Sequence, residues 1–221
     1  MTWAVNFSYR NKNMVKNIIF DLGGVLLNLD QERTLRRFRK LGLDLDEINI
    51  QSPVFKDFET GKMREEEFIH FLKSELKGTA NDEDVLDAWN AMLLDMPKER
   101  VDLVYALQAK FNIYLFSNTN TLHMKEIFRY TDNQLGPGRF SGMFKKMYLS
   151  YELGMRKPSP DAFHKVMQDA NLKGFETVFI DDSKINLKGA QEAGLHTIYA
   201  AQPFDKWALK EIQAIRTLQM N

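Results

Sequence analysis

Five polar side chains stand where apolar stretches of this sequence end. Asp21 follows the run NIIF, and Ser117 and Asn118 follow the run NIYLF. Asp181 and Asp182 follow the run TVFI. Apolar runs without alternation are typical of strands that are buried on both faces of a parallel sheet. Because the carboxyl ends of such strands meet at one edge of the sheet, we expect these side chains to converge there.

The converging groups carry the charges that phosphate chemistry needs. Three carboxylates repel one another unless a cation lies among them, and a set of oxygen ligands favours Mg²⁺. Ser117 offers a hydroxyl group to the phosphate oxygens, and Lys157 offers a positive charge. Asp21 could then attack phosphorus to form an aspartyl-phosphate, while the metal and the lysine stabilise the charge on the equatorial oxygens. The pattern therefore favours a Mg²⁺ site at which a phosphate group is transferred to Asp21.

Alternating strands and helices predict the scaffold of this site. Short apolar runs predict five strands, and amphipathic segments between and after them predict helices. The predicted strands are 17–20, 112–116, 147–149, 177–180 and 197–200, and the predicted helices are 97–110, 121–130, 160–171 and 184–193. This order is typical of the α/β class, and we expect a Rossmann-like doubly wound parallel sheet.

Residues 30–94 interrupt the alternation with helical pattern alone. The clearest predicted helices there are 31–41, 64–77 and 82–94, and Asn81 precedes the last of them as an N-cap would. An insert at this point predicts an α-helical cap beyond the carboxyl ends of the strands. The predicted domains are an α/β core of residues 14–29 and 95–221, a cap of residues 30–94 and an N-terminal extension of residues 1–13, with either Met1 or Met14 as the native start.

The composition narrows the class of protein. The 221 residues hold 30 Lys and Arg against 30 Asp and Glu, and this balance argues against an electrostatic nucleic-acid binder. The absence of cysteine excludes disulfides and thiolate metal sites. No run reaches the roughly 18 apolar residues of a membrane span, and residues 1–13 lack the apolar region of a signal peptide. We therefore expect a cytoplasmic protein with a small-molecule partner, and the sequence leaves the oligomeric state open.

Four sequence motifs, taken in order, resemble the motifs of the haloacid dehalogenase (HAD) superfamily. They are FDLGGVL, FSNTN, YLSYELGMRKP and FIDDSKINLKGAQEAGL. The resemblance extends from residue 15 to residue 199, and the helical insert resembles the C1 cap of that superfamily. The motifs look closest to the bacterial sugar-phosphate phosphatases of the α-D-glucose-1-phosphate phosphatase type. The resemblance therefore implies a Mg²⁺-dependent phosphomonoester hydrolase that acts on a small phosphorylated metabolite, with a sugar phosphate expected.

The same resemblance implies a role for each motif residue. Asp21 would be the nucleophile, and Asp21, Asp182 and Asp181 would hold Mg²⁺ together with the main-chain carbonyl of Gly23. Ser117, Asn118 and Lys157 would bind the phosphate group.

Gly23 departs from the usual pattern of the superfamily. Most of its phosphatases carry an aspartate two residues after the nucleophile, as general acid and then base, although the relatives of the glucose-1-phosphatase type also have glycine here. General acid–base catalysis is worth about 10²–10⁴-fold in rate. A more acidic leaving group, such as an anomeric hydroxyl, would need less protonation. Alternatively, a water or a cap carboxylate takes the role of the acid and base. Glu59, in the predicted turn FETG, is the candidate carboxylate, and we expect it to contact the substrate.

Two other functions stay open on the sequence alone. The first is hydrolytic dehalogenation of a 2-haloacid, with Asp21 attacking carbon, because the haloalkanoate dehalogenases also lack the second aspartate. The paired acids argue against it, since attack on carbon needs no metal. The second is a non-catalytic module that binds a phosphate ligand and has lost its acid–base residue.

Several residues also have a purely structural explanation. An acid after a strand can be a turn residue or an N-cap, and a lysine is usually solvated. Asn118 could orient Asp21 or contact the phosphate, but it is as typical of a turn amide. Asn186 could support the acidic loop or merely cap a turn. The four histidines show no ligand spacing and are interpreted as structural. The cap aromatics Phe55, Phe58 and Trp89 are more typical of a core than of a substrate wall.

Overall fold

The computed structural model describes residues 15–43, 53–76 and 80–200. In this part of the chain five parallel strands form one sheet in the order β3-β2-β1-β4-β5. The strands are β1 (Asn17–Phe20), β2 (Asn112–Ser117), β3 (Lys146–Leu149), β4 (Thr177–Asp181) and β5 (His196–Tyr199). The predicted Rossmann-like sheet is confirmed, and each predicted strand is present within one residue of its expected bounds.

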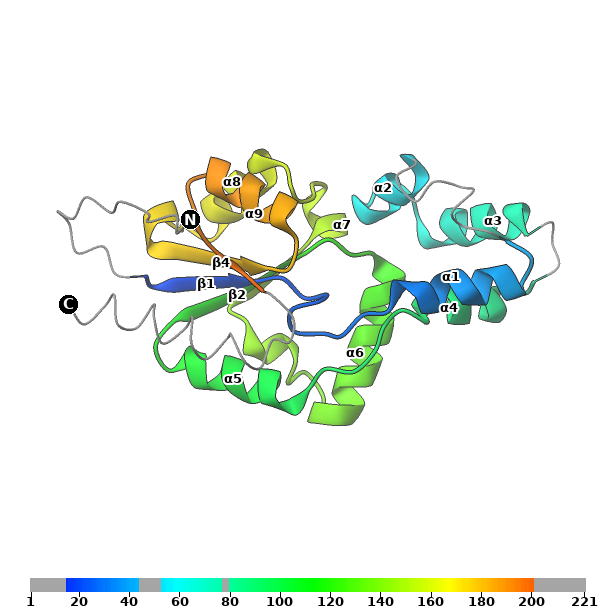
Figure 1. The fold of residues 1–221 in the computed structure, drawn as a ribbon, viewed down its shortest axis with the longest axis horizontal. Coiled ribbons are helices and arrows are strands. Elements are labelled where there is room, and N and C mark those ends of the chain that lie inside the picture. Colours follow the sequence, from blue (N-terminus) through cyan, green and yellow to red (C-terminus); the bar gives the residue numbers. More distant parts are fainter. Residues whose placement is uncertain (1–14, 44–52, 77–79, 201–221) are drawn as a thin grey trace, which may run out of the picture.

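Strand β1 lies at the centre of the sheet and is buried on both faces. Ile18 and Phe20 belong to the apolar cluster on one face, and Ile19 belongs to the cluster on the other. Figure 1 shows helices on both faces, as a doubly wound sheet requires. Helices α5 (Lys98–Gln108) and α6 (Thr121–Leu135) cover one face, and α8 (Pro160–Asp169) and α9 (Lys184–Glu192) cover the other. Burying each large apolar side chain stabilises the folded state by about 1.5–3 kcal/mol. Strand β1 is therefore a rigid support for Asp21, the residue that follows it.

In the described residues of the segment after β1, four helices lie beyond the carboxyl end of the sheet (Figure 1). They are α1 (Gln31–Lys40), α2 (Pro53–Glu59), α3 (Glu65–Glu75) and α4 (Asp82–Asn90). They share an apolar cluster of their own, in which the rings of Phe58 and Phe68 stack at 4.1 Å. Asn81 caps α4 as expected, because its side chain accepts a hydrogen bond of 2.9 Å from the amide of Asp84.

Two short helices are not predicted by the sequence pattern. They are α2 and α7 (Ser150–Leu153), which have seven and four residues. A helix of one or two turns is too short to display a clear apolar stripe. Glu59, which was expected in a turn, is instead the last residue of α2.

Two chain segments connect the helical insert to the sheet, and they pair with each other. Leu29 and Leu93 form an antiparallel bridge, and the amide of Asp30 donates to the carbonyl of Met92 at 2.9 Å. These contacts lie next to the predicted boundaries at residues 29/30 and 94/95.

Among the described helices, none has the length and apolar character that a membrane crossing requires.

Candidate active site

A buried lysine joins two carboxylates at the carboxyl edge of the sheet. The Nζ of Lys157 lies 2.7 Å from Oδ1 of Asp21, which follows β1, and 2.7 Å from Oδ2 of Asp181, which ends β4. Its side chain is 1 % exposed, and the rings of Phe116 and Phe179 lie 5.5 and 5.1 Å from Nζ. A buried charge is tolerated only when it is paired in this way. The predicted convergence of these three residues is therefore observed.

The main chain of Lys157 is fixed by Asn118. Oδ1 of Asn118 accepts a hydrogen bond of 2.9 Å from the amide of Lys157, and Nδ2 donates one of 3.0 Å to its carbonyl. Helix α9 also approaches this loop closely, because a Cβ on Gly189 would lie 1.9 Å from the carbonyl oxygen of Pro158. Asn118 thus connects the end of β2 to the lysine loop and positions the lysine for its two carboxylates.

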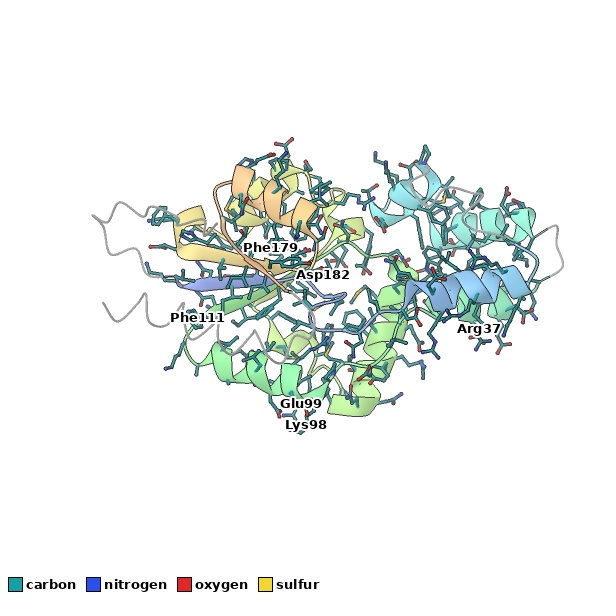
Figure 2. The ribbon with its side chains drawn as sticks, in the orientation of Figure 1. Arg37, Lys98, Glu99, Phe111, Phe179 and Asp182 are labelled. Atoms are coloured by element: carbon teal, nitrogen blue, oxygen red, sulfur yellow. The ribbon has the colours of Figure 1, made fainter. Side chains whose placement is uncertain are left out.

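The two consecutive aspartates have different environments. Asp181 is fully buried and accepts hydrogen bonds from Lys157, from the amide of Ser183 at 2.7 Å, and from Nδ2 of Asn186 at 3.1 and 3.2 Å. Asn186 therefore supports the acidic loop, which was one of its two expected roles. Asp182 is exposed, and Figure 2 shows it at the end of the sheet that faces the helical insert.

The acidic residues suit a magnesium ion. Oxygen atoms of Asp21, Asp181 and Asp182 all lie within 4.8 Å of one another. Mg²⁺ prefers such oxygen donors and usually binds through one or two carboxylates, with phosphate and water completing its shell. The loop after β1 closes tightly over this group, since Gly24 has a φ of +75° and a Cβ there would lie 2.1 Å from Oδ2 of Asp182. The metal role of the Gly23 carbonyl stays a prediction.

Burial and mutual repulsion shift the pKa values of these acids. Burial raises the pKa of Asp21 to about 7; Lys157 opposes this rise, and Asp181 adds to it. Burial and the neighbouring Asp181 raise the pKa of Asp182 as well. Burial lowers the pKa of Lys157, but the two carboxylates outweigh burial and leave this pKa above its ordinary value. A bound cation would favour the ionised acids, which agrees with the set of oxygen donors.

A cavity of about 310 Å³ adjoins this centre, between the end of the sheet and the helical insert. Gly23, Ser117 and Asn118 contribute to its lining from the core, and Glu59 contributes from α2. Glu59 is the one charged residue of this lining, whose apolar members include Leu29, Leu35, Phe55, Trp89, Met92 and Leu93. Small-molecule sites of this size hold a ligand with few, well-placed polar groups. The cavity therefore has room for a small metabolite next to Gly23 and Ser117.

The space next to Gly23 is filled by a leucine. A Cβ at position 23 would lie 2.5 Å from Cδ1 of Leu29, so any side chain there requires Leu29 to move. Leu29 lies on the segment that leads into α1 and lines the same cavity. Where most phosphatases of the resembled superfamily carry an acid, this chain has apolar packing.

His123 is a residue of the cavity that the sequence pattern does not single out. It is buried on α6, and its ring stacks on Trp89 of α4 with the centroids 5.0 Å apart. The side chain of Asn120 accepts from the amide of His123, so its Nδ2 donates to Nδ1 of the ring at 3.1 Å. Nε2 then carries the proton and donates to the carbonyl of Trp89 at 3.3 Å. One neutral tautomer therefore satisfies every contact and connects the insert to the core.

This network predicts a loss of stability in acid. Burial lowers the pKa of His123 from 6.5 to about 4. The unfolded chain binds a proton as the pH falls below 6.5 while the folded chain does not. The contribution of neutral His123 to the free energy of unfolding is thus complete above pH 6.5 and is lost as the pH falls towards 4. We expect the His123→Phe variant, which keeps the ring stacking, to lose about 2 kcal/mol less free energy of unfolding than the parent between pH 7.5 and pH 4.5.

Urea unfolding at the two pH values measures this difference. His164→Phe provides the control, because His164 is exposed on α8. The same pH dependence in the parent and in His123→Phe would contradict the neutral, buried histidine.

Comparison with known proteins agrees with the fold and the site. The model of the haloacid dehalogenase-like hydrolase family matches residues 15–194. The chain therefore belongs to the haloacid dehalogenase-like hydrolase family and is an enzyme of the hydrolase class.

Individual relatives narrow this class. The chain is 31 % identical to the D-ribitol-5-phosphate phosphatase of Bacteroides thetaiotaomicron, over 83 % of this chain and 91 % of that protein. A HAD family enzyme from the same organism, crystallised with magnesium and inorganic phosphate, has a TM-score of 0.82 and 36 % identity over 88 % of this chain and 98 % of that one. A HAD-like hydrolase from Porphyromonas gingivalis has a TM-score of 0.83 and 32 % identity, over 92 % and 98 % of the two chains.

Proposed function

We propose that this protein is a Mg²⁺-dependent phosphomonoester hydrolase of small phosphorylated metabolites of the sugar-phosphate kind. The observation that carries the proposal is the buried Lys157, paired with Asp21 and Asp181 beside the third carboxylate of Asp182. The named phosphatase and the magnesium and phosphate complex among its relatives support the same activity. The cytoplasmic location stays a prediction.

The reaction follows from the position of Asp21. A carboxylate oxygen of Asp21 attacks the phosphorus atom, and the bond to the ester oxygen breaks as the aspartyl-phosphate forms. The ester oxygen leaves with the bonding electrons and takes up a proton. A water molecule then attacks the same phosphorus atom, which releases inorganic phosphate and restores Asp21. Rigid strand ends hold the nucleophile in place for both steps.

The residues around Asp21 would bind the phosphate group and stabilise the negative charge on its oxygens. Lys157 keeps a positive charge 2.7 Å from the nucleophile, and Ser117 lines the cavity, where its hydroxyl group would bind the phosphate. Magnesium held by Asp21 and Asp182 would neutralise negative charge on the phosphate oxygens. We further propose that residues 30–94 act as a cap that excludes water from the cavity during the reaction.

The direct test is phosphate release from a panel of phosphomonoesters. The panel contains ribitol 5-phosphate, several hexose phosphates and anomeric sugar 1-phosphates, each assayed with Mg²⁺ and with EDTA. We expect release that depends on Mg²⁺ and falls by more than about 100-fold in EDTA, because the oxygen charge is then unneutralised. Activity should return when excess Mg²⁺ is added back.

The same assay separates the other functions. Chloride release from 2-haloacids in EDTA would replace the proposal with dehalogenation. Thermal stabilisation by Mg²⁺ and phosphate, with no turnover on the whole panel, would replace it with a binding module. A preference for the anomeric 1-phosphates would explain Gly23 by an acidic leaving group.

A further inference from the structure

One ion pair connects the helical insert to the core at the rim of the cavity. Oε2 of Glu59, at the end of α2, lies 3.1 Å from Nη1 of Arg156, which directly precedes Lys157 in the chain. Glu59 lines the cavity, and the side chains of Glu59 and Arg156 are 29 % and 31 % exposed. The pair is therefore only partly screened by solvent, and it lies next in the chain to Lys157 of the proposed catalytic site.

Arg156 holds one carboxylate oxygen of Glu59 in place. Oε2 of Glu59 is a buried atom next to Nη1 of Arg156, whereas the Glu59 side chain as a whole is 29 % exposed and lines the cavity. A carboxylate has two oxygen atoms and can accept several hydrogen bonds. A hydroxyl group of a ligand in the cavity is a donor that matches the carboxylate of Glu59.

We propose that Glu59, positioned by Arg156, binds hydroxyl groups on the carbon chain of the substrate and thereby selects polyhydroxylated phosphomonoesters. The inference rests on the proposed phosphatase function and adds the residues that determine its specificity. The remaining walls of the cavity are mostly apolar, and Glu59 is the one charged residue among them. An apolar phosphate ester would fill the cavity but would offer no hydrogen bond to the carboxylate of Glu59. A sugar or polyol phosphate would offer one.

The pairing also links substrate binding to the position of the cap. Gly61, two residues after Glu59, has a φ of +69°, and a Cβ there would lie 2.2 Å from the carbonyl oxygen of Tyr151 in α7. The same end of the insert is held to α6 by an ion pair of 2.5 Å between Glu65 and Lys125. These contacts keep the end of α2 against the core, so that Glu59 reaches a ligand that Lys157 and Ser117 hold by its phosphate.

The test compares two ligands that differ in their hydroxyl groups. Ribitol 5-phosphate carries them, and pentyl phosphate keeps the carbon chain and lacks them. Binding is measured by calorimetry in the Asp21→Asn background, with Mg²⁺ present, so that neither ligand is hydrolysed. We expect Glu59→Gln and Arg156→Lys each to weaken binding of ribitol 5-phosphate by about 10- to 100-fold, as for the loss of hydrogen bonds to a charged group. Binding of pentyl phosphate should change by less than about threefold.

A matched variant controls for the loss of one acidic residue. Glu66→Gln makes the same chemical change on α3, where the side chain is exposed and away from the cavity, and it should affect neither ligand. Equal losses for both ligands in Glu59→Gln would overturn the inference, and so would unchanged binding of ribitol 5-phosphate. Because binding is measured without turnover, a protein that selects the hydroxylated ligand yet hydrolyses no phosphomonoester in its parent form would contradict the phosphatase function alone.

Discussion

Replacing Asp21 by asparagine should abolish phosphate release, with a fall in kcat of about 10⁴- to 10⁶-fold, as for the loss of other catalytic nucleophiles. The amide has nearly the shape of the carboxylate but is a poor nucleophile towards phosphorus. It also removes one of the three oxygen donors that lie within 4.8 Å of one another. Steady-state phosphate release and single-turnover labelling with a radioactive substrate both measure the effect.

The fold should survive this change, because Lys157 keeps its ion pair of 2.7 Å with Asp181 when Asp21 becomes an amide. The amide and the carboxylate are similar in size, and no buried charge loses its last partner, so the free energy of unfolding should change little near neutral pH. Asp169→Asn is the control, since Asp169 is a partly exposed acid that pairs with Lys146 at 2.6 Å outside the site. Phosphate release by Asp21→Asn within tenfold of the parent would contradict the role of Asp21 as nucleophile.

Replacing Lys157 by methionine should damage both stability and activity. The change keeps the length of the side chain and removes a charge that lies 2.7 Å from each of two buried carboxylates. Breaking a buried ion pair by removing one partner costs about 3–5 kcal/mol. Loss of one group that stabilises the transition-state charge costs about 10²–10³-fold in kcat. Urea unfolding and phosphate release measure the two losses separately.

The pH dependence of this variant gives a second measurement. Without the lysine, Asp21 loses the partner that opposes the rise of its pKa, so this pKa lies further above its unfolded value and the folded chain binds the extra proton. The loss of stability in Lys157→Met should therefore be largest near pH 7 and should shrink as the pH falls towards 4. Adding Asp181→Asn should recover part of the lost stability at pH 7, because it removes one unpaired charge. Lys146→Met, at an exposed lysine, serves as the control. A loss below 1 kcal/mol at pH 7 would contradict the buried ion triad.

Local signals in the sequence determined the scaffold and the candidate residues. The apolar runs that lead to Asp21 and to Asp181 predict buried strands because a strand covered on both faces admits few polar side chains. The polar residue that ends each run marks the carboxyl edge of a parallel sheet, where these residues lie in the structure. The cap of α4 was also predictable, because an N-cap depends on residues three positions apart.

The different roles of the site residues depend on contacts between residues that are far apart in the chain. Asp181 and Asp182 are equivalent in sequence, but Lys157 and Asn186 hold the first and leave the second exposed. Asn118 holds a loop 39 residues away in the chain. No local pattern encodes such a partner, because the contact exists only once the strands are aligned.

The sequence by itself therefore determined the α/β class, the helical insert and the acids, lysine and serine that meet at one edge of the sheet. Only the tertiary structure decided that Leu29 fills the space beside Gly23, that His123 joins the insert to the core, and that Glu59 meets Arg156. The physical reason is that periodicity reports which side of an element is buried, whereas the partner across an interface is set by the packing of whole elements against one another.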